Sequence, residues 1–495
     1  MAALTPFPKL TKYRTAEALR ARWAELGWDI PCDDEIQTAS QGSPLATPLD
    51  VCGKTLSNRW CIHPMEGWDG TTQGEPTDWT RRRWESFGRS GAKLIWGGEA
   101  VAVQPQGRAN PNQLMLNEQT QATISDLRDR LIHAHREDVG ETRDLLIGLQ
   151  LTHSGRFARP NSNKKLEPRI AYHHPLLDQK FGIDPQDDRA VLTDNELYDL
   201  MDDYVRCARL AAAIGFDFVD LKCCHGYLGH ELLSARVRLG PFGGSFENRT
   251  RFIRELIQRV QSEVPSLGIG VRVSAFDILP FEDDPATRVG RHKGKGVPMS
   301  TERAMPYEYG FGVSRDDPLQ PDLAEARRFL ELLESLDVRL VNISCGSPYY
   351  NPHIQRPAAY PPSDGYQPPE DPLVGVARQI DIVRQLKASF PNLVLVGSGY
   401  SYLQEFLPHV AQAVIRQGWV DVVGLGRMVL SYPELPLDAL RRGELAVKRI
   451  CRTFSDCTTG PRIGLRSGCY PLDTAYKNSE EAADLKRYKR SLDAV

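Results

Sequence analysis

Hydrophobic positions recur along the chain as eight short continuous runs, each followed by a stretch of helical periodicity and each ending in polar residues or glycine. Uninterrupted runs rich in Val, Ile and Leu are typical of strands buried on both faces, as in a parallel sheet. Eight such runs alternating with helices predict an α/β fold of the (β/α)8 TIM-barrel type. The runs are Trp60–Pro64, Lys93–Trp96, Leu145–Leu149, Phe218–Leu221, Ile269–Val273, Leu340–Ile343, Leu393–Val396 and Val420–Leu425.

The chain of 495 residues exceeds the about 250 residues of a minimal barrel, and the surplus has identifiable places. Residues 1–42 form an N-terminal extension with one amphipathic helix at about Thr15–Leu26. The barrel is expected over 43–445, and a cysteine-containing C-terminal segment over 446–495.

Two long insertions interrupt the barrel after its fifth and sixth strands, at 278–318 and 345–372. Both follow the carboxyl ends of strands, on the face where barrel enzymes hold their active sites. We therefore expect lids or walls of a substrate site; the alternative is that they only decorate the surface.

Charge and composition exclude several classes of protein. The chain has 61 basic and 64 acidic residues, a balance that gives no reason to expect nucleic acid or an anionic membrane as partner. No apolar stretch approaches the ~18 residues of a membrane span, and the first residues lack the pattern of a secretory signal. Ten cysteines in so long a chain do not indicate a disulfide scaffold. The sequence predicts a soluble cytoplasmic protein.

Residue types suited to an anionic cofactor follow several strands. Arg272 lies on an otherwise apolar strand, and a buried cation requires an anion. Gly399 and Gly426 lie in turns after the last two strands, where barrels bind phosphate, and Arg427 adds charge. The alternatives are a structural ion pair for Arg272 and ordinary strand-to-helix turns for the glycines.

The fourth strand runs into Lys-Cys-Cys-His-Gly-Tyr-Leu at 222–228, followed by Gly-Gly-Ser-Phe-Glu-Asn-Arg at 243–249. With the other strand ends, these motifs resemble the old yellow enzyme family of flavin-dependent oxidoreductases. The longer branch of that family, with 2,4-dienoyl-CoA reductase and trimethylamine dehydrogenase, is the most similar. The resemblance extends from about Ser43 to about Leu472.

The resemblance implies a barrel that binds FMN. Arg272 would stabilise the negative charge of reduced flavin near N1 and O2, and Gln150 would contact the flavin edge. The residues expected at the cofactor are Pro64, Met65, Glu66, Ala100, Gln150, Arg272, Ser398, Gly399, Gly426 and Arg427.

The resemblance also assigns catalytic roles. Lys222 and His225 would bind the electron-withdrawing oxygen of the substrate, and Tyr227 would donate a proton. Lys222 departs from the usual His, and Glu66 stands where relatives have Thr or Cys. A cation over the flavin favours an anionic oxygen such as an enolate. The alternatives are a structural Glu66–Lys222 salt bridge and merely packed roles for His225 and Tyr227.

Three cysteines lie near the C-terminus, where longer relatives hold a [4Fe–4S] cluster. They are Cys451, Cys457 and Cys469, but Phe454 occupies the second cluster position. Because four thiolates are the normal complement, we expect the cluster to be absent. An unusual three-cysteine cluster and a zinc site are the alternatives.

The chain ends at Val495 without a Gly-x-Gly-x-x-Gly motif after a strand, so we expect no electron-relay domain. The flavin would then be reduced directly, by a nicotinamide or by the substrate.

These features predict an FMN-dependent enzyme that uses NAD(P)H to reduce an activated C=C bond, with a small molecule and a nicotinamide as partners. The alternative in flavin chemistry is a dehydrogenase or N-demethylase that passes electrons to a separate acceptor, for which Glu66 would bind a cationic amine. A Schiff-base lyase using Lys222 and a non-catalytic flavin-binding protein are further alternatives. The oligomeric state stays open, and a homo-oligomer is compatible with the sequence.

Overall fold

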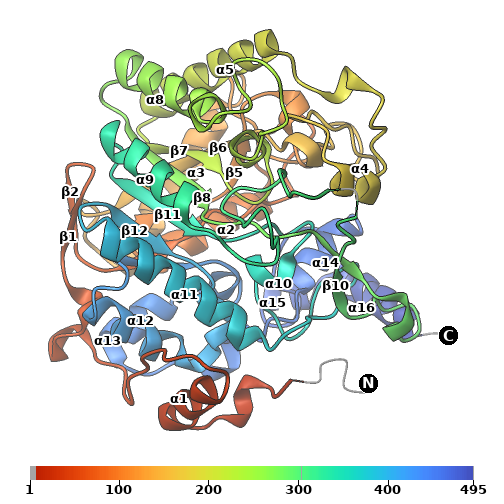
Figure 1. Cartoon of the computed structure of the whole chain (residues 1–495). Coiled ribbons are helices and arrows are strands. Elements are labelled where there is room, and N and C mark those ends of the chain that lie inside the picture. Colours follow the sequence, from red (N-terminus) through yellow and green to blue (C-terminus); the bar gives the residue numbers. More distant parts are fainter. Residues whose placement is uncertain (1–6, 303, 494–495) are drawn as a thin grey trace.

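The computed structural model describes residues 7–302 and 304–493. Its centre is a closed barrel of eight parallel strands, which confirms the predicted (β/α)8 fold (Figure 1). The strands, in order around the barrel, are β3 (Trp60–Ile62), β4 (Leu94–Ile95), β6 (Leu146–Thr152), β7 (Phe218–Cys223), β8 (Gly268–Ser274), β11 (Leu340–Ser344), β12 (Val394–Gly397) and β13 (Val422–Leu425). Pairing of β13 with β3 closes the ring. Each of these strands coincides with one of the predicted runs.

One helix packs outside the barrel after each strand. These helices are α2 (Asp78–Gly88), α3 (Gln121–Asp138), α5 (Asp194–Ala213), α8 (Arg251–Glu263), α9 (Ala324–Ser335), α11 (Pro372–Ser389), α12 (Leu407–Arg416) and α13 (Leu435–Arg442). Their apolar residues recur at helical spacing, as in α8, where Phe252, Leu256 and Val260 are buried on one face.

The amino end of the barrel is filled by side chains. The hairpin of β1 (Leu49–Val51) and β2 (Lys54–Leu56) covers it, and Leu56 joins a buried cluster inside the barrel. Phe218 fills much of the interior because glycine at 148 and 270 leaves room for its ring. Ligands therefore have access only to the opposite, carboxyl end, where barrel enzymes hold their sites.

Two strands, β6 and β7, extend furthest beyond the apolar runs that predicted them. β6 continues to Thr152 and β7 to Cys223, because Gln150 pairs with Ala100 and Lys222 pairs with Arg272. Ala100 belongs to β5 (Ala100–Ala102), which continues the second strand after a break at Gly97 and Gly98. These polar side chains are thus fixed on strands and not on loops.

Short elements surround the carboxyl end of the barrel. The insertion after β8 contains the antiparallel pair β9 (Phe281–Asp283) and β10 (Gly296–Pro298), and the insertion after β11 contains α10 (Pro352–Gln355). The other short helices before α9 are α4 (Pro175–Phe181), α6 (Leu228–Leu233) and α7 (Phe246–Arg249).

The C-terminal segment folds into α14 (Asp456–Arg462), α15 (Thr474–Lys477) and α16 (Glu480–Asp493), which lie beside β10 and α10 in Figure 1. The N-terminal helix α1 (Ala16–Glu25) begins at Thr15, whose side chain accepts a hydrogen bond from Ala18 N.

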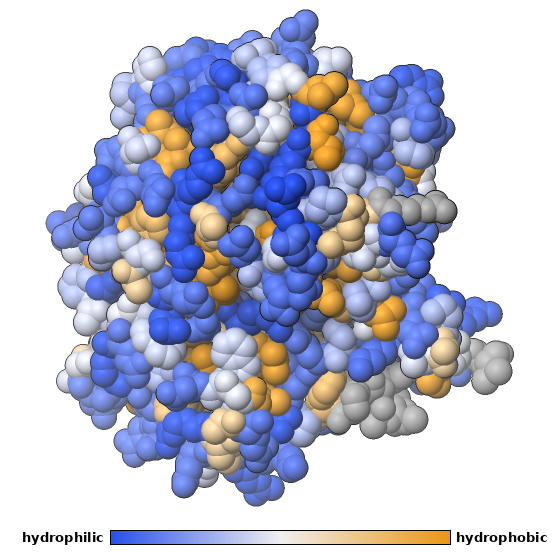
Figure 2. Space-filling view, in the orientation of Figure 1, coloured by the Kyte–Doolittle hydropathy of each residue, from blue (hydrophilic) through white to orange (hydrophobic). Residues whose placement is uncertain are grey.

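On the face drawn in Figure 2, hydrophilic residues predominate and hydrophobic residues lie in small separate groups. None of the helices within 7–302 and 304–493 has the length and apolar character needed to cross a membrane.

Candidate functional site

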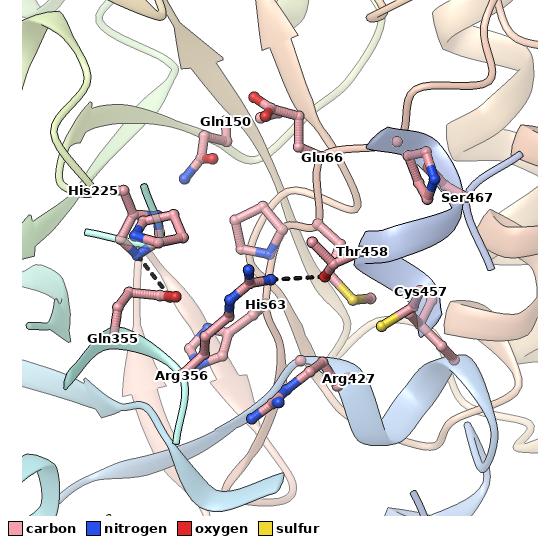
Figure 3. A pocket seen from close by; sticks show the side chains of 18 of the residues that line it. His63, Glu66, Gln150, His225, Gln355, Arg356, Arg427, Cys457, Thr458 and Ser467 are labelled. Atoms are coloured by element: carbon pink, nitrogen blue, oxygen red, sulfur yellow. Dashed lines mark hydrogen bonds between the residues drawn. The ribbon is translucent and has the colours of Figure 1, made fainter. Parts of the chain in front are cut away.

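One cavity at the carboxyl end of the barrel brings together all the predicted cofactor and catalytic residues (Figure 3). We call it the flavin cavity, after the cofactor that the sequence predicts for it. The predicted residues that line it are Pro64, Met65, Glu66, Ala100, Gln150, Lys222, His225, Tyr227, Arg272, Ser398, Gly399, Gly426 and Arg427. They come from seven of the eight strands or from the loops that follow them, and only β11 contributes none.

Asp220, fully buried on β7, positions two of these residues. Its carboxylate accepts hydrogen bonds from the side chains of Gln150 (2.5 Å) and Trp96 (2.6 Å) and from the backbone of Arg272 (2.7 Å). Burial raises the pKa of Asp220, and the three donors oppose that shift. Because the Gln150 amide nitrogen is used by Asp220, its carbonyl oxygen is left for a ligand in the cavity.

Arg272 is a buried cation without a carboxylate partner. Within the described part of the chain its guanidinium forms no ion pair and contacts only the Ser398 hydroxyl, at 3.5 Å. Its Nε atom is buried without a hydrogen-bond partner. A buried charge in this state is costly unless an anion binds to it. The geometry thus offers the Arg272 guanidinium to a negatively charged group in the cavity, and not to a structural ion pair.

His63 lines the same cavity and was not among the predicted site residues. Asn342 donates to its Nδ1 at 3.0 Å, which leaves Nε2–H to donate to the Ser398 hydroxyl at 3.1 Å. Burial and the Arg272 charge hold the pKa of His63 well below its usual value, so the ring is neutral. A side chain at Gly424 would overlap the His63 ring. The sequence feature that could have predicted His63 as a site residue is its position directly after the first strand.

A cluster of arginines marks the other end of the flavin cavity. The Arg427 guanidinium donates to Pro357 O at 2.7 Å, while its Nη1 is buried without a partner. Arg356 donates to the Thr458 hydroxyl at 2.7 Å, and its Nε and Nη2 have no partner. Burial, then the charges of Arg462 and Arg427, lower the pKa of Arg356 to about 9. A bound anion would relieve the repulsion among the guanidinium groups of Arg356, Arg427 and Arg462.

The turns beside these arginines leave room for such an anion. Gly399 has φ +93°, and a side chain there would overlap Gln379, so only glycine suits the position. Gly426 faces open space, with nothing within 4 Å of a Cβ built on it. The arrangement suits a phosphate group held by backbone and guanidinium donors. Arg356 could not be predicted because its loop carries no recognisable motif.

Lys222 and Glu66 do not pair with each other in the described structure. The Lys222 ammonium instead lies over the Tyr227 ring, 3.8 Å from its centroid. Glu66 accepts a hydrogen bond from the Tyr227 hydroxyl (2.5 Å) and a longer one from Gln113 (3.4 Å). Burial lowers the pKa of Lys222, and Glu66 opposes this shift. Instead of forming a salt bridge with each other, Glu66 and Lys222 therefore both contact Tyr227.

A strained turn brings Tyr227 into the cavity. His225 and Gly226 follow β7 with φ of +68° and +78°, a conformation that is unfavourable for His. The Ser274 hydroxyl accepts from His225 N at 3.1 Å, and the Ser347 hydroxyl donates to His225 O at 2.8 Å. A Cβ at Gly226 would come within 2.8 Å of the Tyr350 ring. The His-Gly-Tyr sequence therefore builds this turn.

The His225 ring has a defined neutral tautomer. The Gln355 side-chain nitrogen, which is always a donor, lies 3.3 Å from His225 Nε2, and the Ser344 hydroxyl lies 3.0 Å from the same atom. Burial and the charges of Arg272 and Lys222 hold the pKa of His225 well below its usual value. The ring therefore carries its proton on Nδ1, which can donate to a ligand.

The C-terminal segment supplies one wall of the flavin cavity. Cys457, Thr458 and Pro461 of α14 line it, as do Ser467 and Gly468 (Figure 3). The Ser467 hydroxyl accepts from Trp68 N at 3.0 Å.

Buried Arg83 anchors this wall. It pairs with Asp69 (2.7 Å) and Glu99 (2.5 Å) and donates to the Ser467 carbonyl (3.0 Å). One buried cation thus links the loops after β3 and β4 to the C-terminal segment.

The motif at 243–249 lies outside the cavity and has a structural role. Ser245 caps α7, and buried Arg249 donates to Leu233 O and pairs with Glu325 of α9. It ties the long connection after β7 to the neighbouring helix.

The three C-terminal cysteines do not form a metal cage among the described residues, where no group of three His, Cys, Asp or Glu is arranged as ligands. Cys451 and Cys469 are buried, and Cys457 lines the flavin cavity. Burial raises the pKa of Cys457 to about 11. Phe454, at the second cluster position, packs beside Tyr360 with the rings tilted and their centroids 5.5 Å apart.

Comparison with known proteins identifies relatives over most of the chain. Residues 44–288 match the family described as NADH:flavin oxidoreductase / NADH oxidase. The chain is 27% identical to NADH:flavin oxidoreductase FG08077 of Gibberella zeae over 418 residues, 81% of this chain and 87% of the relative. It is 31% identical to an NADPH dehydrogenase of Bacillus subtilis over 251 residues, 50% of this chain and 68% of the relative.

Solved structures share the fold at low identity. A 2-naphthoyl-CoA reductase aligns with a TM-score of 0.63 and 16% identity, over 88% of this chain and 57% of that chain, so this chain spans little more than half of that longer protein. An old yellow enzyme homologue from Zymomonas mobilis aligns with a TM-score of 0.54 and 20% identity, over 81% of this chain and 94% of that one.

Proposed function

The chain belongs to the NADH:flavin oxidoreductase / NADH oxidase family and is an FMN-dependent oxidoreductase of the old yellow enzyme type; we propose that it uses NAD(P)H to reduce an activated carbon–carbon double bond. The observation that carries the proposal is the position of the Lys222 ammonium, 3.8 Å above the Tyr227 ring in the flavin cavity. A cation that polarises an oxygen and a hydroxyl that gives a proton are the two groups that such a reduction requires.

The residues of the cavity fit FMN. The partnerless Arg272 would bind the pyrimidine edge of the flavin, with the Gln150 carbonyl beside it. The turns at Gly399 and Gly426 and the free Arg427 Nη1 would hold the phosphate. When bound, FMN supplies hydride transfer between the nicotinamide and the second substrate.

Lys222 and His225 would bind the carbonyl oxygen of the substrate. The ammonium and the Nδ1–H of the neutral imidazole are both donors, so they stabilise the negative charge that gathers on this oxygen as the double bond is reduced. The Lys222 ammonium carries a full positive charge, whereas a neutral donor would offer only a bond dipole. Lys222 therefore stabilises a negatively charged oxygen more strongly. The expected substrates are therefore enones, conjugated acids and thioesters, whose reduction passes through an enolate-like oxygen.

Tyr227 would donate the proton to the α-carbon of the substrate. Loss of that proton leaves a negative phenolate, which the Lys222 ammonium over the ring stabilises. The Tyr349 hydroxyl, 2.8 Å from that of Tyr227, can return a proton to the phenolate. Glu66 holds the Tyr227 hydroxyl in place through its carboxylate.

Two anaerobic half-reactions test the proposal. NADH or NADPH is added to the flavin-loaded protein, and the flavin absorbance band should bleach. A cyclic enone added next should restore the band and yield the saturated ketone in equal amount. A flavin that stays oxidised with both nicotinamides, or that no enone reoxidises, would refute the proposal.

A second function is favoured by the free charge of Glu66, which forms no ion pair among the described residues and lines the flavin cavity. This carboxylate could bind a cationic amine, as a dehydrogenase or N-demethylase with a separate electron acceptor would require. Bleaching of the flavin by methylated amines, without any nicotinamide, would support this function over the first.

We also propose that the three C-terminal cysteines hold no iron–sulfur cluster, so that electrons reach the flavin directly. Their side chains are not arranged as ligands in the described structure, and Phe454 replaces a thiolate. Iron and acid-labile sulfide at about four equivalents each in anaerobically purified protein would contradict this.

A further inference from the structure

A second cavity of about 360 Å³ adjoins the flavin cavity. The two cavities share five lining residues, so the second one lies directly beside the first. The shared residues are Trp68, Pro348, Tyr349, Arg356 and Arg462. The volume lies within the range of about 300–1,000 Å³ for ligand sites. We call this second cavity the basic antechamber.

Five positively charged residues, each from a different segment of the chain, line the antechamber. They are Arg159 after β6, Lys180 of α4, Lys293 between β9 and β10, Arg356 after α10, and Arg462 of α14. The carboxylates that line it are only two, Asp283 and Asp364. The lining therefore has an excess of three positive charges. Figure 1 shows α4, β10, α10 and α14 gathered on one side of the molecule.

Both carboxylates are already neutralised. Asp364 pairs with Arg462. Asp283 pairs with Arg288 at 2.5 Å and with Lys293 at 3.3 Å. The positive excess consequently rests on the other three residues.

None of these three cations forms an ion pair among the described residues, although the charges of Glu282 and Asp283 act on Lys180. The Arg159 guanidinium forms no hydrogen bond or ion pair with the residues that the structure describes. Lys180 donates to the neutral carbonyl of Phe281 at 2.9 Å. Arg356 contacts the Thr458 hydroxyl and leaves two nitrogens buried without partners. Cations held together in a partly enclosed site require an anionic ligand of comparable charge.

We infer that the basic antechamber binds a phosphate-bearing arm of a molecule whose other end reacts in the flavin cavity. The inference rests on the proposed function, since it assumes that this reacting end lies beside Lys222 and Tyr227. Guanidinium groups bind phosphate through paired hydrogen bonds, and ammonium groups add charge. Two sources have this chemistry: the phosphates of the NADPH donor, or phosphate groups on the alkene substrate itself.

The test is calorimetric titration of the flavin-loaded protein with inorganic pyrophosphate. Bound FMN would occupy the phosphate site at Gly399, Gly426 and Arg427, so pyrophosphate should bind once, beside Arg159 and Lys180, which line only the antechamber, and leave the flavin in place. The double variant Arg159→Gln/Lys180→Gln should bind pyrophosphate at least about 10-fold more weakly, because two charge-assisted contacts are lost. The charge-preserving double variant Arg159→Lys/Lys180→Arg should retain binding within a few-fold.

A matched control removes two positive charges elsewhere. Lys448 and Lys486 are exposed and line neither cavity. The double variant Lys448→Gln/Lys486→Gln should bind pyrophosphate as the parent protein does. Absence of pyrophosphate binding, release of flavin by pyrophosphate, or equal weakening in this control would overturn the inference. If the first double variant does not retain flavin, Lys180→Gln alone replaces it, with an expected weakening of about threefold.

The source of the phosphate groups is identified by measuring how the rate of flavin reduction depends on the NADPH concentration. If Arg159→Gln/Lys180→Gln needs a higher NADPH concentration to reach half of the maximal rate, the phosphate-bearing arm belongs to the nicotinamide donor. Unchanged saturation, together with lost pyrophosphate binding, assigns it to the alkene substrate. Pyrophosphate binding without any enone turnover would contradict the proposed function alone. Enone turnover without pyrophosphate binding would contradict this inference alone.

Discussion

The Tyr227 hydroxyl donates a 2.5 Å hydrogen bond to the carboxylate of Glu66, a residue 161 positions earlier in the chain. Lys222 lies over the face of the same ring, so one phenol contacts both a negative and a positive group. Burial raises the pKa of Tyr227 well above its usual value, and Glu66 and Tyr349 raise it further. The phenol is therefore protonated at neutral pH, and its proton lies in the hydrogen bond to Glu66.

Replacing Tyr227 by Phe removes the proposed proton donor and keeps the ring under Lys222. We expect the rate at which an enone reoxidises the reduced flavin to fall by about 10²- to 10⁴-fold, the range for a lost general acid. Stopped-flow absorbance measures this rate separately from reduction by NADPH. Tyr349→Phe, which removes only the neighbouring hydroxyl, should cost about 5- to 10-fold. Equal rates for Tyr227→Phe and the parent protein would exclude Tyr227 as the donor.

Glu66→Gln should move the alkaline limit of activity to lower pH. The Glu66 charge raises the pKa of Tyr227 and also that of Lys222, and both groups act in their protonated forms. Activity is present below these pKa values and is lost as pH rises through them, so removal of the charge shifts the loss downward by about one unit. The pH dependence of enone reoxidation measures this limit. Glu444→Gln, at an exposed site, should leave it in place.

Arg272→Gln should weaken FMN binding by about 10- to 100-fold, because it removes a charge-assisted contact. Equilibrium dialysis of FMN measures the change. The flavin-free variant should unfold at no lower temperature than the flavin-free parent, because the lost cation has no carboxylate partner in the described structure. Arg254→Gln on α8 is the matched control, since Arg254 lies outside the cavity. Unchanged FMN affinity in Arg272→Gln would contradict the assigned role.

The eight strands could be predicted because burial on both faces makes each one a continuous apolar run. The predicted site residues lie together in one cavity because they follow these strands in order, and their roles stay a prediction. The sequence did not reveal which of these side chains contact one another. Lys222 and Glu66 suit a salt bridge by charge alone, yet Tyr227 lies between them because of the turn at His225 and Gly226.

Arg356 and Tyr349 could not be predicted, because they lie on an insertion whose conformation depends on distant contacts. Arg356 is held by Thr458, 102 positions later, and Tyr349 by stacking on Phe157 with ring centroids 3.9 Å apart. No local pattern of residues encodes such contacts.

Gly226→Ala tests the turn that presents Tyr227. At φ +78° a Cβ is strained by about 1–2 kcal/mol, and here it also meets the Tyr350 ring. Gly418 has a similar φ of +67° with nothing within 4 Å, so Gly418→Ala has the strain without the overlap. We expect Gly226→Ala to lower the free energy of unfolding by more than Gly418→Ala, and only Gly226→Ala to slow enone reoxidation. Chemical denaturation and stopped-flow kinetics compare the two variants. Similar effects in both would show that the Tyr350 contact is unimportant.

Glu99→Gln tests the buried triad around Arg83. Burial raises the pKa of Glu99 from 4.5 to about 7, against the opposing charge of Arg83. Because the folded state then keeps a proton that the unfolded state loses, the raised pKa stabilises the fold at low pH, and this stability is lost as pH rises above 4.5. Thermal unfolding between pH 4.5 and 8 should show a smaller decline in Glu99→Gln than in the parent. Glu75→Gln, whose site lies outside the triad, should follow the parent. Identical pH profiles for Glu99→Gln and the parent would rule out this linkage.

The hydrogen bond between Trp68 and Ser467 joins positions 399 residues apart. All eight strands lie before residue 426, whereas the wall formed by α14, Ser467 and Gly468 belongs to the C-terminal segment. The barrel and the enclosure of its mouth are therefore encoded by separate stretches of the chain, and this hydrogen bond holds the second stretch against the first.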